Sequence, residues 1–226
     1  MVVLGFDTAT PSTAVAVLTA DGRAVEHRDD PPPGRRPGHA AKLLELAELA
    51  LEDAGVGWDA VTRLAVGVGP GGFTGLRIGI ATARALAQAR ALEIAPVGSL
   101  HALAAGAAAT VTRPVLAVLD ARRGEAFAAA WDAAGAPVLA PAALPPEALE
   151  RAVADLPEPP LAVGDGAVRF RAELQRAGAV VPADDAPVHR LSAEHVCRLG
   201  AAGRVVGLGA LVPDYIRDPD ATPPPR

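Results

Sequence analysis

The sequence predicts an α/β protein built from two similar halves, each with a mixed β-sheet and flanking helices. Continuous apolar runs, typical of strands buried on both faces, open the halves at 2–6 and 115–119. Each run ends in an aspartate, Asp7 or Asp120, and a polar turn and a second strand pattern follow. A turn glycine lies fifteen residues after each aspartate. These three observations indicate an internal duplication.

A duplicated strand–aspartate–turn–strand unit is typical of the actin-like (ASKHA, ribonuclease-H-like) fold, in which a nucleotide lies between two subdomains. We therefore expect an N-terminal subdomain over 1–110 and a C-terminal subdomain over 111–226, with a disordered tail from about 219. In that arrangement Asp7 and Asp120 would face each other across the cleft.

The elements of the first half follow from local patterns. The proline-rich segment 29–38 can form neither a helix nor an inner strand. Apolar residues recurring every three or four positions predict a helix that ends at Gly55. In chain order we predict strands 2–6, 13–19 and 23–27, helix 39–54, strand 64–68, helix 74–90 with Thr74 as its N-cap, strand 94–97, and a helix from Leu100 with Ser99 as its N-cap.

The second half repeats the opening meander and then alternates helices with short strands. Ser192 is a suitable N-cap for the last helix. In chain order we predict strands 115–119 and 125–131, helix 146–154, strand 161–163, helix 166–177, strand 179–181 and helix 193–202.

Composition excludes several classes of protein. The chain has 226 residues, half of them apolar, and a net charge of −5 with dispersed basic residues, which argues against a stand-alone nucleic-acid binder. The single cysteine, Cys197, excludes a disulfide framework, fits a reducing compartment and is predicted to be a small buried residue. No signal peptide and no membrane-spanning run is visible, so we expect a cytoplasmic protein without membrane contact.

The most informative segment is 67–79, a glycine-rich loop followed by a helix that contains Gly75 and Gly79. A dinucleotide-binding loop is disfavoured because Pro70 interrupts it and no acidic residue ends the next strand. A Walker-type phosphate loop is excluded because no lysine follows the glycines. Glycine in a helix costs about 1 kcal/mol relative to alanine. The small helix face must therefore lie against a phosphate, the protein's own core or a partner.

We favour a partner, because the helices 39–54 and 74–90 are both apolar beyond what one core contact needs. On this interpretation Gly79→Leu leaves the monomer folded and abolishes partner binding. The predicted partner interface comprises His39, Leu43, Leu46, Ala50, Gly75, Leu76, Gly79, Ile80 and Ala83.

The residues needed for catalysis are missing. Ala9 stands where a phosphate-binding turn needs glycine, the histidines lack zinc-ligand spacing, and no serine lies in a nucleophile motif. We therefore predict no catalytic residue, no metal site and no unaided ATP turnover. A vestigial nucleotide cleft would comprise Asp7, Thr8, Asp120, Gly164 and Gly166. The alternative is an actin-fold nucleotide-dependent transferase or a peptidase.

The segment 67–79, GVGPGGFTGLRIG, resembles the signature of the TsaB (YeaZ) family, as do the blocks 5–10, 119–127 and 213–217. The resemblance implies a non-catalytic dimerisation subunit that pairs through its first two helices with a TsaD-like threonylcarbamoyltransferase. It also implies a TsaE-like ATPase that docks on the pair and indirect contact with tRNA. A further alternative is a homodimer that forms through the same apolar helix face when the partner is absent. The family implies no cofactor, with ATP or ADP possible only at a partner interface.

Overall fold

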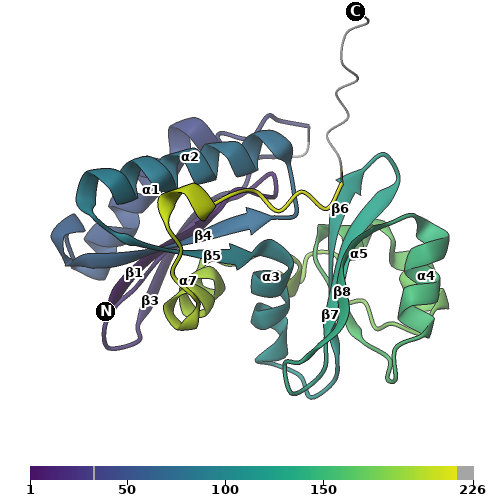
Figure 1. Ribbon diagram of the computed structural model, residues 1–226. Helices are drawn as coiled ribbons and strands as arrows, with labels where there is room; N and C mark the ends of the chain where they lie inside the picture. Colours follow the sequence, from purple (N-terminus) through teal and green to yellow (C-terminus); the bar gives the residue numbers. More distant parts are fainter. Residues whose placement is uncertain (33, 218–226) are drawn as a thin grey trace, which may run out of the picture.

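The computed structural model describes residues 1–32 and 34–217, which form two lobes, each around one β-sheet (Figure 1). The first sheet has five strands in the order β3-β2-β1-β4-β5. The first three strands form an antiparallel meander, and β4 and β5 run parallel to β1. The bounds are β1 Val2–Asp7, β2 Thr13–Leu18, β3 Ala24–Asp29, β4 Val61–Gly69 and β5 Glu93–Gly98.

The second sheet repeats this plan with four strands in the order β8-β7-β6-β9. Its first three strands are an antiparallel meander, and β9 is parallel to β6. The bounds are β6 Val115–Arg122, β7 Glu125–Trp131, β8 Pro137–Leu144 and β9 Leu161–Val163. The repeated meander agrees with the duplication predicted from the sequence.

The helices form three layers around the two sheets. Helices α1 (His39–Ala54) and α2 (Phe73–Arg90) cover the outer face of the first sheet. Helices α3 (Ser99–Ala108) and α7 (Ala193–Ala202) lie between the two sheets (Figure 1). The outer face of the second sheet carries α4 (Pro146–Ala154), α5 (Asp165–Arg169) and α6 (Arg171–Arg176). Three short 3-10 turns span Trp58–Ala60, Pro187–His189 and Leu208–Ala210.

The middle layer unites the two lobes in one apolar core. Side chains of both sheets, such as Ala65 and Leu119, pack with α3 and α7 in a single cluster. Two glycines allow α7 to lie very close to the first sheet. A Cβ on Gly5 would lie 2.5 Å from Cys197 Sγ, and one on Gly200 would lie 2.3 Å from Ala65 Cβ.

All strands of the first sheet precede residue 110, and all strands of the second follow it. After the second sheet the chain returns to the first lobe, where α7 packs on β1, β2 and β4. Part of the predicted C-terminal subdomain therefore lies on the N-terminal lobe. The tail predicted to be disordered from 219 lies outside the described residues.

Several local predictions need correction. The helix predicted at 166–177 is two short helices that meet at Phe170, and the strand predicted at 179–181 is a single bridge between Val180 and Leu161. Gly72, not Thr74, is the N-cap of α2. Ser99 does not cap α3, because its hydroxyl is used elsewhere, as described below. The Ser192 cap is confirmed, since its side chain accepts from the Glu194 amide. None of the helices in residues 1–32 and 34–217 is long and apolar enough to cross a membrane.

The thiol of Cys197 is fully buried, as predicted, and Sγ lies 3.2 Å from the Ala16 carbonyl oxygen. Burial raises the pKa of the Cys197 thiol. Because the thiolate is the reactive form, we expect a thiol reagent such as Ellman's reagent to label the native protein only as fast as the protein opens. The same protein in denaturant is the control and should react at once. Rapid stoichiometric labelling of the native protein would contradict this prediction.

Candidate functional site

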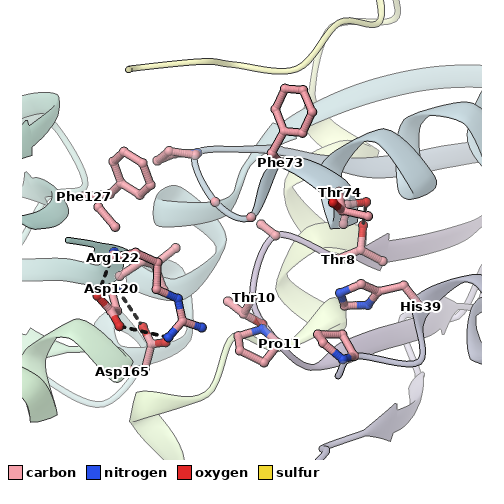
Figure 2. A pocket seen from close by; sticks show the side chains of 18 of the residues that line it. Thr8, Thr10, Pro11, His39, Phe73, Thr74, Asp120, Arg122, Phe127 and Asp165 are labelled. Atoms are coloured by element: carbon pink, nitrogen blue, oxygen red, sulfur yellow. Dashed lines mark hydrogen bonds and ion pairs between the residues drawn. The ribbon is translucent and has the colours of Figure 1, made fainter. Parts of the chain in front are cut away.

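The two lobes enclose a cleft of about 800 Å³ (Figure 2). One wall consists of the turn after β1 and the first turn of α2. The other wall consists of the ends of β6 and β7 with the start of α5. The segment 214–217 forms part of the rim. This is the position of the nucleotide cleft that the sequence predicted.

The spaced glycines of 67–79 pack against the chain itself. The turn that follows β1 fills the space beside their Cα atoms. The backbone of this turn is also bound directly, since the Gly72 amide donates to the Ala9 carbonyl oxygen at 2.7 Å. Four of these glycines have no room for a side chain. A Cβ on Gly67 would lie 2.0 Å from Asp7 Oδ2, and one on Gly71 would lie 2.3 Å from the Ala9 carbonyl oxygen. A Cβ on Gly75 would lie 2.0 Å from the Thr8 carbonyl oxygen, and one on Gly79 would lie 2.5 Å from Thr8 Oγ1.

These contacts correct the expectation for Gly79→Leu. A side chain at this position meets the Thr8 hydroxyl, and that hydroxyl is fixed by its hydrogen bond to the Gly75 carbonyl oxygen at 2.8 Å. The substitution would therefore disturb the folded monomer, and loss of partner binding would not by itself identify an interface.

Asp7 is sealed behind the glycine loop, with 1% of its surface exposed. Its carboxylate accepts from the Ala9 amide at 2.7 Å and from the Ser99 hydroxyl at 2.6 Å. Burial raises the pKa of the Asp7 carboxyl, and the two hydrogen bonds oppose part of that effect. The prediction that Asp7 and Asp120 face each other across the cleft is therefore wrong.

Asp120 lines the opposite wall, but its carboxylate already forms ion pairs with two arginines. Its side chain is 10% exposed and accepts from Arg122 at 3.3 Å (Figure 2). It also accepts from Arg169 at 2.8 Å. The Asp120 amide donates to the Asp165 carboxylate at 3.1 Å. The arrangement neutralises Asp120 within the lobe.

The two remaining cleft candidates have a packing role. A Cβ on Gly164 would lie 2.1 Å from the Val118 carbonyl oxygen, and one on Gly166 would lie 2.7 Å from the Leu119 carbonyl carbon. Both glycines let α5 approach β6. Of the five predicted cleft residues, Thr8 and Asp120 line the cleft, whereas Asp7, Gly164 and Gly166 lie behind its walls. Within residues 1–32 and 34–217, no three His, Cys, Asp or Glu side chains come together in a way that could hold a metal ion.

Comparison with known proteins identifies the family. A family model described as "TsaD: tRNA N6-adenosine threonylcarbamoyltransferase" matches residues 32–143. The Escherichia coli "tRNA threonylcarbamoyladenosine biosynthesis protein TsaB" is 38% identical over 129 residues, which are 56% of this chain and 53% of that protein. The solved structure of YeaZ from Pseudomonas aeruginosa is 30% identical, with a TM-score of 0.78, and the match covers 95% of this chain and 99% of that chain. The chain belongs to the TsaB (YeaZ) family.

The chain spans about half the length of the curated TsaB proteins that it matches. A more distant structure, the ethanolamine utilization protein EutJ from Carboxydothermus hydrogenoformans, shares the fold at 13% identity. Its TM-score is 0.54, and the match covers 87% of this chain and 90% of that chain. The duplicated actin-like fold predicted for this TsaB-family chain is confirmed.

The nine residues predicted as the partner interface are all buried in this TsaB-family chain. This assignment is corrected, because the apolar stripes of both helices face the first sheet and the turn after β1. Sequence periodicity cannot distinguish such a stripe from one that awaits a partner. The apolar side chains of these helices that are exposed include Leu44 and Leu49 on α1 and Phe73, Ala81 and Ala85 on α2.

The rim of the cleft holds an aromatic cluster that the sequence did not predict. Phe73 stacks on Tyr215 with ring centroids 5.6 Å apart, and the Arg77 guanidinium lies 3.7 Å from the Phe73 centroid. Arg77 Nε also donates to the Tyr215 hydroxyl at 3.1 Å. Beyond it, Arg217 pairs with Glu125 of the second lobe at 2.8 Å. The block 213–217 carried part of the family resemblance, but no local pattern placed it beside α2.

Proposed function

We propose that this chain is a non-catalytic subunit in the formation of N6-threonylcarbamoyladenosine in tRNA, and that it pairs with a TsaD-like threonylcarbamoyltransferase. The observation that carries the proposal is the sealed Asp7. A carboxylate that handles Mg²⁺ or a phosphate must reach the ligand, whereas this one is enclosed by Gly67, Ala9 and Ser99. The names of the TsaB relatives supply the pathway.

The proposed contact surface is the outer side of α1 and α2. The two helices pack next to each other on the first sheet (Figure 1). Leu44, with 48% of its surface exposed, is the most exposed large apolar residue of the two helices. Ala81 and Ala85 are exposed one turn apart on α2, where their small side chains would let a partner helix approach closely. Covering this face would remove apolar surface from water at about 25 cal/mol per Å², before association costs.

The test is co-purification of the full chain with a TsaD-like subunit from the same genome. We expect Leu44→Glu to weaken the complex by about tenfold or more, because it places a charge in an apolar contact. Val180→Glu is the matched control, since Val180 is similarly exposed, at 44%, on the second lobe. Both variants should keep the wild-type melting temperature, because both side chains point to solvent.

Formation of the modified nucleoside should follow the same pattern. The Leu44→Glu variant should lose modification activity when it is mixed with its partner and tRNA, and Val180→Glu should retain it. Equal binding and activity for Leu44→Glu and the wild type would contradict the proposed surface.

The remaining expectations belong to the same proposal. A TsaE-like ATPase would dock on the pair, tRNA would be reached through the complex, and the isolated chain would form a homodimer through the same face. Nucleotide would bind only where the partner completes a site. A cytoplasmic location fits this role. Titration of the isolated chain with Mg-ATP separates these expectations from a stand-alone enzyme, for which binding and turnover should both be measurable.

A further inference from the structure

The first turn of α2 presents unused hydrogen-bond donors to the cleft. In the part of the chain that the structure describes, no side chain caps α2. The Gly72 amide donates to the Ala9 carbonyl oxygen, and the Leu76 amide donates to the Gly72 carbonyl oxygen. The amides of residues 73, 74 and 75 have no acceptor among the described residues. All three residues line the cleft. The N-terminus of an 18-residue helix also carries a partial positive charge.

A second donor comes from a different element. His39, the first residue of α1, is 5% exposed, yet it lines the cleft (Figure 2). Its Nδ1 lies 2.8 Å from the Thr13 hydroxyl oxygen. Its Nε2 has no partner among the described residues and lies beside the first turn of α2, 3.1 Å from the position of a Cβ on Gly75.

The pairing with Thr13 determines the role of that nitrogen. Thr13 is fully buried, and among the described residues Nδ1 is the only acceptor for its hydroxyl hydrogen. The Thr13 hydroxyl therefore donates to Nδ1, and the ring proton resides on Nε2. Burial lowers the pKa of His39, so this neutral form holds at neutral pH, and the nearby charge of Asp29 opposes the shift only in part. Nε2–H therefore lies at the cleft wall and has no acceptor among the described residues.

We propose that this corner of the cleft binds an oxyanion, the phosphate or carboxylate group of a small molecule, through the free amides of the first α2 turn and His39 Nε2. Arg36 lies on the same side of the cleft and adds a positive charge. The acidic groups lining the cleft are Asp214 on the rim and Asp120 and Asp165 on the opposite lobe. Asp120 is already paired with arginines.

The rest of the cleft suits the body of such a molecule. Its volume of about 800 Å³ exceeds what a bare anion needs, and Pro70, Ile78 and Phe127 give it apolar walls. The Asp7 carboxylate takes no part in this site, because it is sealed behind the glycine loop. It is also complete within one chain, so it can be tested without the proposed partner.

The experiment is a titration of the isolated full-length chain, followed by amide and histidine side-chain NMR. Inorganic phosphate and acetate are the two probes, and they distinguish a phosphate site from a carboxylate site. We expect the amide signals of residues 73–75 and the Nε2 signal of His39 to shift together, with a Kd of about 1 mM for the better probe.

Two pairs of variants test the two donors. His39→Phe keeps a ring but removes the donor, and should weaken binding by about tenfold. His39→Gln retains an N–H group and an acceptor for Thr13, and should bind almost normally. Thr74→Asp places a carboxylate beside the free amides and should abolish binding without lowering the melting temperature. Val180→Asp is its control, because it adds the same charge at an exposed position outside the cleft, and it should bind as the wild type does.

Each result of these titrations either supports or overturns the proposed oxyanion site. Saturable shifts at the α2 amides and at His39 that are lost in His39→Phe and Thr74→Asp support the site. Absence of shifts at these positions with both probes overturns it, and so do shifts that survive Thr74→Asp. Failure here would leave the proposed partner surface untouched, because that surface lies on the outer side of α1 and α2.

Discussion

Gly75→Ala should lower the free energy of unfolding by about 3 kcal/mol, the upper end of the usual cost of overpacking. A Cβ at position 75 would lie 2.0 Å from the Thr8 carbonyl oxygen, a backbone atom that cannot rotate away. The same turn is bound by the Gly72 amide, and the Thr8 hydroxyl donates to the Gly75 carbonyl oxygen. Chemical denaturation of the purified variant and the wild type measures the difference.

Gly57→Ala is the matched control for this prediction. A Cβ there meets no atom within 4 Å, and the backbone φ of −94° is open to any residue. Its free energy of unfolding should stay within about 0.5 kcal/mol of the wild type. If Gly75→Ala were as stable as Gly57→Ala, the turn after β1 would not be packed as described.

Replacing Asp7 separates its charge from its hydrogen bonds. Asparagine can accept from the Ala9 amide and donate to the Ser99 hydroxyl oxygen, and it removes the buried charge. We therefore expect Asp7→Asn to be at least as stable as the wild type at pH 8. Asp7→Ala leaves the Ala9 amide and the Ser99 hydroxyl without their acceptor. It should cost about 1–3 kcal/mol of the free energy of unfolding.

The buried Asp7 carboxyl also makes the free energy of unfolding depend on pH, in a direction that follows from its raised pKa. Because the folded pKa of Asp7 is raised above its ordinary value of 3.8, the native state keeps a proton that the unfolded chain has released. The contribution of this group to the free energy of unfolding therefore falls as the pH rises from about 3.8 through the raised folded pKa. Other carboxyls, such as Asp165 with its own raised pKa, add to the slope of both proteins. The difference in free energy of unfolding between the wild type and Asp7→Asn, measured from denaturation curves across that range, should therefore fall as the pH rises.

The same variant tests the non-catalytic role. With the TsaD-like partner present, Asp7→Asn should support nucleoside modification as well as the wild type does. Loss of modification by a stable Asp7→Asn variant that still binds its partner would indicate that the carboxylate has a chemical function.

Local patterns were sufficient for most elements of the fold. The bounds of helices 39–54, 146–154 and 193–202 and of strand 161–163 agree with the structure, since each has its own periodicity or cap. The break at Phe170 was not predictable, because α5 and α6 share one continuous helical pattern. The return of 193–202 to the first sheet depends on contacts between distant segments, which no local pattern encodes.

The site was less predictable, for a physical reason. The glycines at 67–79 indicated that something lies very close to their backbone, but any close-packed neighbour gives the same signal. The structure identifies that neighbour as the turn at Thr8. His39 was singled out as an interface residue, whereas its observed surroundings depend on Thr13 and on α2, neither of which is near it in sequence.

The helices α3 and α7, which lie between the two sheets, also bear on how the molecule can move. Bending one lobe against the other would have to pull apart a buried apolar cluster that includes Leu103, Val196 and Leu119 and expose its side chains to water. This packing therefore opposes any change in the angle between the lobes, and we expect the opening that faces solvent to keep a similar width when a ligand binds.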